Sequence, residues 1–383
     1  MNDNSMVTAQ NKFIDGCWKK FSDYYTPCIS DKNIVIYGAG VYGQFRYKAL
    51  DHIGYSNNIK YFINDYVKNP DELLFDIPVV SYDKITDKNN YIFIIGIQNC
   101  HSLINKLETD SVDYIQPDNS QGFYQDNLMN SVYKCIHLDS ISDALYKIEY
   151  YYNNMLGEEQ KIIDLYKEEY SKKIIENRLL FYKTGDVKYI DANKISVNEY
   201  FDSNYYSLTN DEVYVDCGAY DGDSILSFIS HVSGKYKKII GFEPDKISYS
   251  KLKTNVSKYN SIELFPYATG KDNKQVRFES NGLLGASLSD SGDIIEMVKL
   301  DDVLIDEEVS LIKMDIEGAE LETLKGLKDT ILKYHPKLAV CIYHKMDDIY
   351  DIPTYIHELV PEYRFKVRQH VSSLLDTVLY CEC

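Results

Sequence analysis

The stretch that decides the fold is VYVDCGAYDGD, residues 213–223. Its first three residues favour a short strand that delivers Asp216 at its carboxyl end. Gly218 and Gly222 then let the backbone turn tightly and approach a ligand before a helix begins near Ser224. A strand, a glycine turn and a helix in this order are typical of a nucleotide-binding unit in an α/β sheet.

An acid follows where such a unit binds ribose. The strands expected after the turn are 238–242, 262–265, 311–314 and 338–342. Their alternation with helical segments predicts a doubly wound parallel sheet. Glu243 ends the first of them, about 25 residues beyond the turn, which is close to the spacing of a ribose-binding acid. Its carboxylate can accept both ribose hydroxyl hydrogens of NAD or of S-adenosylmethionine, so this acid alone does not choose the cofactor.

The acids of the turn distinguish these two cofactors. In a dinucleotide site the helix N-terminus holds a pyrophosphate, which Asp216, Asp221 and Asp223 would repel. S-adenosylmethionine has no phosphate, and carboxylates attract its sulfonium and ammonium groups. The loop therefore favours S-adenosylmethionine, although these aspartates could instead serve only to cap the following helix.

A second glycine loop, GAGVYG at residues 38–43, follows an expected strand and precedes an expected helix. Gly38, Gly40 and Gly43 fit the pattern G-x-G-x-x-G, and Asp65 lies about 20 residues farther on, where a ribose-binding acid is expected. The surrounding stretch holds one mononucleotide half and not the two that a dinucleotide occupies. It resembles the nucleotide-sugar-binding half-domains of sugar-modifying enzymes. Nucleotide or nucleotide-sugar binding, NAD binding and a structural or oligomerising role all stay open.

The chain of 383 residues is long enough for two globular domains. Between the two glycine loops, Ile162, Tyr166 and Tyr170 repeat at four-residue spacing, which predicts helices, and Gly185 offers a C-cap. The expected parts are an N-terminal extension at 1–32, a Rossmann-like α/β domain at 33–120, a helical connector at 121–200 and a larger α/β domain at 201–383.

The formal net charge of −18 opposes nonspecific binding to nucleic acid or to an anionic membrane, and favours a small molecule or a protein as partner. The sequence has no apolar run long enough for a membrane span and no signal peptide at its N-terminus, so we expect a cytoplasmic protein. Its eight cysteines are scattered and show no zinc-binding spacing, so we interpret them as reduced and mostly structural.

Four motifs resemble, in order, those of the FkbM-type methyltransferase family. They are VDCGAYDGDS at 215–224, GFEPD at 241–245, LDD at 300–302 and KMDIEGAE at 313–320. The resemblance covers about residues 213–380. It implies the seven-stranded class I methyltransferase fold, S-adenosylmethionine as cofactor, and O-methylation of sugars or natural products.

The resemblance also implies which residues bind the cofactor. They are Asp216, Gly218, Ala219, Tyr220, Asp221, Gly222, Asp223, Glu243 and Pro244. Within this set it places the methionine end against Asp216 and Gly218, and the ribose on Glu243. Tyr220 departs from this pattern, because many class I enzymes carry a second glycine at its position.

Methyl transfer needs an aligned acceptor and, for a hydroxyl group, a proton acceptor. Asp315 and His344 follow two expected strands at their carboxyl ends, and His370 is a third candidate for catalysis. Glu317 and Glu320 could add oxygen ligands for a divalent cation. A solvated acidic first turn is the preferred interpretation of these two glutamates, so no metal is predicted.

The sequence thus predicts a methyltransferase that modifies an oxygen, less often a nitrogen, of a sugar, glycan or nucleotide-sugar-linked acceptor. The alternatives are an NAD-dependent sugar oxidoreductase or epimerase using the first glycine loop, and a noncatalytic glycan-assembly protein. Oligomerisation stays open.

Overall fold

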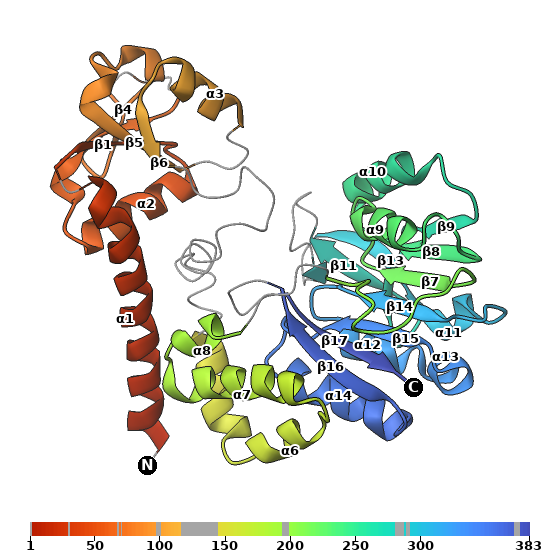
Figure 1. Ribbon diagram of the computed structural model, residues 1–383. Coiled ribbons are helices and arrows are strands. Elements are labelled where there is room, and N and C mark those ends of the chain that lie inside the picture. The colour runs from red at the N-terminus through yellow and green to blue at the C-terminus, as the bar shows by residue number, and fades with distance from the viewer. Residues whose placement is uncertain are drawn as a thin grey trace. The chain divides into compact units, whose positions relative to one another are not determined.

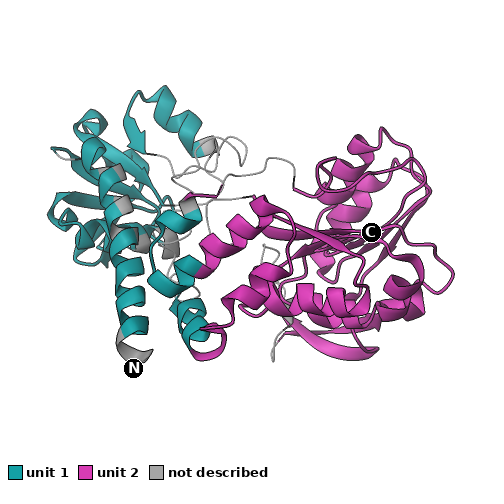
Figure 2. Cartoon of the chain, turned by 60° about the horizontal axis from the view of Figure 1, so that its bottom comes forward, with its two compact units in different colours: residues 1–152, 180–191 teal, residues 153–179, 192–383 magenta. Residues whose placement is uncertain are grey.

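The computed structural model describes residues 2–29, 31–66, 69, 71–96, 101–115, 145–193, 199–279, 287–288, 292–370 and 376–383. The chain forms two compact units (Figure 2). Unit 1 contains residues 1–152 and 180–191, and unit 2 contains residues 153–179 and 192–383. The stretch expected as a connector therefore contributes to both units, and its residues 121–144 lie outside the described part.

Unit 2 is built on a seven-stranded sheet (Figure 1). Its strands are β7 (Val213–Cys217), β8 (Lys238–Phe242), β9 (Ile262–Phe265), β14 (Leu311–Met314), β15 (Lys337–Cys341), β16 (Arg364–Gln369) and β17 (Thr377–Glu382). They lie in the order β16-β17-β15-β14-β7-β8-β9, and only β17 runs antiparallel to its neighbours. The strands expected from the sequence are all present. Because the chain reverses its winding at β7, the carboxyl ends of β8, β7 and β14 meet at one edge of the sheet, where ligands bind in such folds.

The central strands are apolar because helices cover both faces of the sheet. All five residues of β7 and all four of β14 are buried. On one face Tyr214 packs with Phe228 and Leu252, which come from α9 (Asp223–His231) and α10 (Lys246–Val256). The remaining helices that follow β14 in this unit are α12 (Glu320–Lys325), α13 (Lys328–Tyr334) and α14 (Asp348–Leu359).

A second, four-stranded sheet interrupts this pattern between β9 and β14. It contains β10 (Ala268–Gly270), β11 (Lys274–Glu279), β12 (Ser287–Leu288) and β13 (Asp293–Lys299), in the order β10-β13-β11-β12. The short helix α11 (Leu300–Val303) follows β13. In it, the carboxylate of Asp301 accepts hydrogen bonds from the backbone N–H of Asp329, at 3.0 Å, and of Thr330, at 2.9 Å. The third motif of the sequence thus caps α13.

Part of the expected connector packs on β16 at the sheet edge of unit 2. Its elements are a π-helical turn (Tyr151–Met155), α6 (Glu159–Asp164) and α7 (Glu169–Thr184), and the contact is made by residues between α6 and α7 and at the start of α7. Arg368 of β16 makes two hydrogen bonds, of 2.7 and 2.8 Å, to the carboxylate of Glu168. Gly185 follows α7 with φ +67, as a C-cap requires, and a Cβ there would lie 1.7 Å from the carbonyl oxygen of Ala9.

Unit 1 contains a six-stranded sheet. Its elements are α1 (Asn2–Ile29), β1 (Asn33–Tyr37), α2 (Val41–His52), β2 (Ile59–Ile63), β3 (Leu73–Leu74), β4 (Ile77–Val80), β5 (Tyr91–Ile95), α3 (His101–Thr109), β6 (Asp113–Ile115), α8 (Lys188–Asp191) and 3₁₀ turns at Ser56–Asn58, Tyr82–Lys84 and Lys88–Asn90. The strand order is β3-β4-β2-β1-β5-β6, with only β3 antiparallel to its neighbour. The N-terminal extension forms the long helix α1, which the sequence did not predict. Among the helices described in either unit, none has the length and apolar character needed to cross a membrane.

Candidate functional site

The glycine turn after β7 and the acid after β8 are joined directly. The backbone N–H of Tyr220 donates a 2.8 Å hydrogen bond to one carboxylate oxygen of Glu243, and that of Asp245 donates a 2.8 Å bond to the other. Glu243 is only 7% exposed, and this burial raises the pKa of its carboxyl group to about 7. A carboxylate has about four acceptor positions, so two remain for the hydroxyls of a ribose.

Asp216 has protein partners on both of its oxygens. Oδ1 lies 3.2 Å from Nζ of Lys313, and Oδ2 accepts hydrogen bonds from the hydroxyls of Tyr214, at 2.8 Å, and Ser224, at 2.5 Å. Nζ of Lys313 also donates a 2.7 Å bond to the carbonyl of Gly218. Burial alone would lower the pKa of Lys313, but Asp216 and nearby carboxylates raise it above its usual value. Asp216 therefore holds the turn together and is itself fully buried.

The glycines of the turn allow neighbouring loops to pack closely. A Cβ on Gly218 would lie 2.0 Å from the carbonyl oxygen of Asp315, and φ at Gly218 is +81. Gly222 has φ +94 and faces Leu252 of α10. Tyr220 also has a positive φ of +46, although it carries a side chain.

The other residues expected at the cofactor surround this turn. Ala219 is buried in the core of unit 2, and Pro244 is half-buried beside Glu243. The carbonyl of Asp221 accepts a 2.8 Å hydrogen bond from the side chain of Asn255. Asp223 begins α9 and is exposed. With Asp216 neutralised by a lysine, the acidic character of the loop comes from Asp221 and Asp223.

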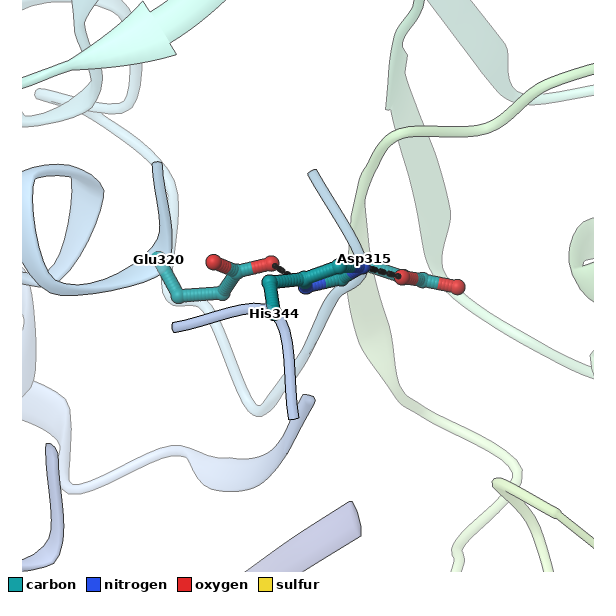
Figure 3. Close-up of side chains that lie close together, drawn as sticks. All are labelled: Asp315, Glu320 and His344. Carbon is teal, nitrogen blue, oxygen red and sulfur yellow. Dashed lines mark ion pairs between the residues drawn. The ribbon is translucent and has the colours of Figure 1, made fainter. Parts of the chain in front are cut away.

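A cluster of charged side chains follows β14 and β15 (Figure 3). We call Asp315, Glu317, Glu320 and His344 the His344 cluster. The imidazole lies between two carboxylates, with Nδ1 2.8 Å from Oε1 of Glu320 and Nε2 3.4 Å from Oδ1 of Asp315. Nε2 also lies 3.5 Å from Oε2 of Glu317. Burial lowers the pKa of His344, but Glu320 and the other carboxylates outweigh it and raise the pKa to about 9.

The interpretation of Glu320 as part of a solvated turn is wrong. Its side chain is fully buried, and Oε1 accepts a 3.0 Å hydrogen bond from the backbone N–H of Ile316. The bond closes the turn between β14 and α12, in which Glu317 and Gly318 both have positive φ. Glu317 is 36% exposed, so only this one of the two glutamates reaches solvent.

Two tyrosines that the sequence did not single out contact Asp315. Tyr200 donates a 3.2 Å hydrogen bond to Oδ2, and Tyr343 donates a 3.3 Å bond to Oδ1. The ring of Tyr200 also lies 5.4 Å from Nζ of Lys313. Lys313 itself carried a signal, because a lysine inside a buried apolar strand needs a charged partner. Tyr200 precedes the strands by more than ten residues and carried none.

His370 belongs to a different network. It is 5% exposed, and its Nε2 lies 2.7 Å from the hydroxyl of Tyr380, which in turn donates to the carbonyl of Glu199. The structure therefore brings Asp315 and His344 together, with His370 engaged by β17.

The glycine loop of unit 1 is tightly packed at Gly43 and open at Gly40. A Cβ on Gly43 would lie 1.7 Å from the carbonyl oxygen of Gly38, whereas one on Gly40 would meet nothing within 4 Å. Asp65 follows β2 and accepts hydrogen bonds from the hydroxyl of Tyr37, at 2.5 Å, and from the backbone N–H of Tyr82, at 3.2 Å. Both oxygens of this expected ribose acid thus already bind protein groups.

Known proteins resemble this chain in two ways: a family match lies within its second unit, and one solved structure is similar over its full length. Residues 216–367 match the methyltransferase FkbM domain. The crystal structure of methyltransferase FkbM from Methylobacillus flagellatus KT is similar over 100% of this chain and 99% of its own, with 20% identity and a TM-score of 0.59. An rRNA methylase from Streptococcus thermophilus is similar over 45% of this chain and 87% of its own, with 16% identity and a TM-score of 0.30. No curated protein sequence matches the chain. The FkbM structure confirms the expected fold class.

Proposed function

We propose that this S-adenosylmethionine-dependent methyltransferase methylates a hydroxyl oxygen of a sugar-bearing acceptor. Its residues 216–367 match the methyltransferase FkbM domain. The observation that carries this proposal is the meeting of two sites at one edge of the sheet. The residues after β7, β8 and β14 are neighbours there, since Cys217 pairs with both Phe242 and Met314. The cofactor loop and Asp315 therefore lie side by side.

On the cofactor side, Glu243 accepts the ribose hydroxyls with the two acceptor positions that Tyr220 and Asp245 leave open. The backbone of the turn from Gly218 to Asp221 lies against the methionine end. Asp216 acts indirectly, by fixing Lys313 and through it the carbonyl of Gly218. Asp221 and Asp223 supply the negative charge that favours a sulfonium.

On the acceptor side, the bound cofactor supplies a methyl group on a sulfonium. The acceptor oxygen forms a bond to the methyl carbon, the carbon–sulfur bond breaks with its electrons left on sulfur, and the acceptor loses its proton. Asp315 takes this proton, because its carboxylate is 29% exposed at the strand edge while His344 is nearly buried. Tyr200 and Tyr343 hold the carboxylate in place.

The polar character of this edge supports a sugar. A sugar offers hydroxyls to carboxylates, and the partly exposed side chains of Asp315 and Glu317 supply carboxylates there. The glycine loop of unit 1, open on the side of Gly40, would bind a nucleotide.

A transfer assay tests the proposal. Purified protein is incubated with S-adenosylmethionine labelled in its methyl group and a panel of monosaccharides, glycans and nucleotide-sugars, and products are analysed by mass spectrometry and NMR. We expect an O-methyl ether on a sugar, with turnover lowered at least about a hundredfold by Asp315→Asn, as expected for loss of a general base. Transfer to nitrogen or only to acceptors without a sugar would contradict it.

A further inference from the structure

The buried ring of His344 has no hydrogen bond at Nε2. Its side chain is 9% exposed. Nδ1 faces Oε1 of Glu320 at 2.8 Å. Within the described residues, Nε2 is among the buried polar atoms that make no hydrogen bond. Since buried polar atoms almost always have a partner, Nε2 indicates a ligand.

The distances around Nε2 are those of neighbouring ligands on a metal ion. Nε2 lies 3.4 Å from Oδ1 of Asp315 and 3.5 Å from Oε2 of Glu317. Two atoms bound at about 2.1 Å to one ion, at adjacent positions, lie about 3 to 3.5 Å apart. Ligand atoms of Asp315, Glu320 and His344 also lie within 4.8 Å of one another.

The composition of the cluster suits a cation. Three carboxylates face one imidazole, and the side chains of His344 and Glu320 are at least nine-tenths buried. Glu320 stands on the Nδ1 side, as the carboxylate behind a metal-bound histidine commonly does, and so directs Nε2 toward the other two acids.

We propose that the His344 cluster binds one divalent metal ion through Nε2 of His344 and the carboxylates of Asp315 and Glu317, with Glu320 holding the other ring nitrogen. One imidazole and two carboxylates suit a first-row ion such as Mn²⁺. Asp315 and Glu317 are partly exposed, which leaves positions for an acceptor oxygen. Polarisation of that oxygen by the ion rests on the proposed function; binding of the ion does not.

The test is a titration of the metal-free full-length chain with Mn²⁺ at 0.15 M salt, since salt screens weak binding to a chain of net charge −18. Electron paramagnetic resonance measures the free ion. We expect one Mn²⁺ per chain, affinity lowered about a hundredfold or more by Asp315→Asn and His344→Ala, and about ten- to hundredfold by Glu320→Gln. Glu322→Gln, on the same helix but paired with Lys325 at 2.6 Å, should bind like the wild type.

Absence of stoichiometric Mn²⁺ binding would overturn the proposal, and so would equal binding by wild type and His344→Ala. Circular dichroism checks that each variant folds; if His344→Ala does not, Asp315→Asn decides, because its side chain is partly exposed. Calorimetry with S-adenosylmethionine on the same samples separates the two proposals. If the protein binds the cofactor and methylates a sugar but does not bind Mn²⁺, only the metal-site proposal is contradicted. If it binds Mn²⁺ but does not methylate a sugar, only the acceptor assignment is contradicted.

Discussion

The backbone N–H of Tyr220 donates a 2.8 Å hydrogen bond to the carboxylate of Glu243 and so ties the turn after β7 to the end of β8. These residues are far apart in sequence, but Cys217 and Phe242, which end the two strands, pair directly. The carboxylate is thus held in a fixed orientation before any ligand arrives. Preorganisation of this kind lowers the entropy lost on binding.

Replacement of Glu243 should therefore weaken cofactor binding. Glu243→Ala removes the acceptor of two ribose hydroxyls, and we expect the dissociation constant for S-adenosylmethionine, measured by calorimetry, to rise about ten- to hundredfold, or about 1.4 to 2.8 kcal/mol. Glu263→Ala, on the exposed side of the neighbouring strand β9, is the matched control. Equal affinity of both variants would contradict the role of Glu243.

The affinity should also depend on pH. Burial raises the pKa of Glu243 to about 7 in the free protein, and ribose binding favours the ionised carboxylate, which accepts two hydroxyls. Below pH 7 a proton must leave before the cofactor binds, so affinity should fall about tenfold per pH unit there and level off above pH 8. Calorimetry between pH 5.5 and 8.5 measures this dependence, and an affinity for S-adenosylmethionine that stays constant over that range would disprove the linkage.

Replacement of Gly218 should lower the free energy of unfolding for two reasons: its positive φ and the lack of space for a side chain. Gly218→Ala places a Cβ 2.0 Å from the carbonyl oxygen of Asp315, whereas Gly234→Ala meets nothing within 4 Å although φ is similar, +73 against +81. The control isolates the cost of positive φ, about 1 to 2 kcal/mol. We expect urea denaturation to show a clearly larger loss for Gly218→Ala, and equal losses would mean that the loops do not pack as described.

The buried pair of Lys313 and Asp216 offers a second stability test. Lys313→Met leaves Asp216 without its cation, and we expect a loss of about 3 to 5 kcal/mol in the free energy of unfolding. Asp216→Asn added to Lys313→Met removes the unpaired charge and should recover part of that loss. A double variant no more stable than Lys313→Met would argue against a direct pairing.

The sequence predicted five strands of the seven-stranded sheet, β7, β8, β9, β14 and β15, because each is a short apolar run whose end is marked by a polar residue or a glycine. Glu243 could be placed for the same reason: an acid at a strand end faces the ligand edge of a parallel sheet. Asp315 and His344 were found by this rule too, and the structure brings them together.

What the sequence could not supply was which polar groups are satisfied within the protein. From the sequence Asp216 is an acid of the cofactor loop, and only the structure places Lys313 from β14 beside it. The structure likewise shows that Asp301, part of the third motif, caps α13. Glu320 reads as a solvated residue until the turn closes over it. Such outcomes depend on contacts between elements distant in sequence, which local patterns do not encode. The four-stranded sheet between β9 and β14 was not predicted, because its two longer strands, β11 and β13, are only partly buried and lack a continuous apolar run.

The central claim, that the turn after β7 and Glu243 bind S-adenosylmethionine, is tested most directly by calorimetry on the wild-type chain with S-adenosylmethionine, its demethylated product S-adenosylhomocysteine and NADH. The account predicts one site per chain for S-adenosylmethionine and S-adenosylhomocysteine, and no NADH binding that competes with them. Binding of NADH without either of the other two would contradict it.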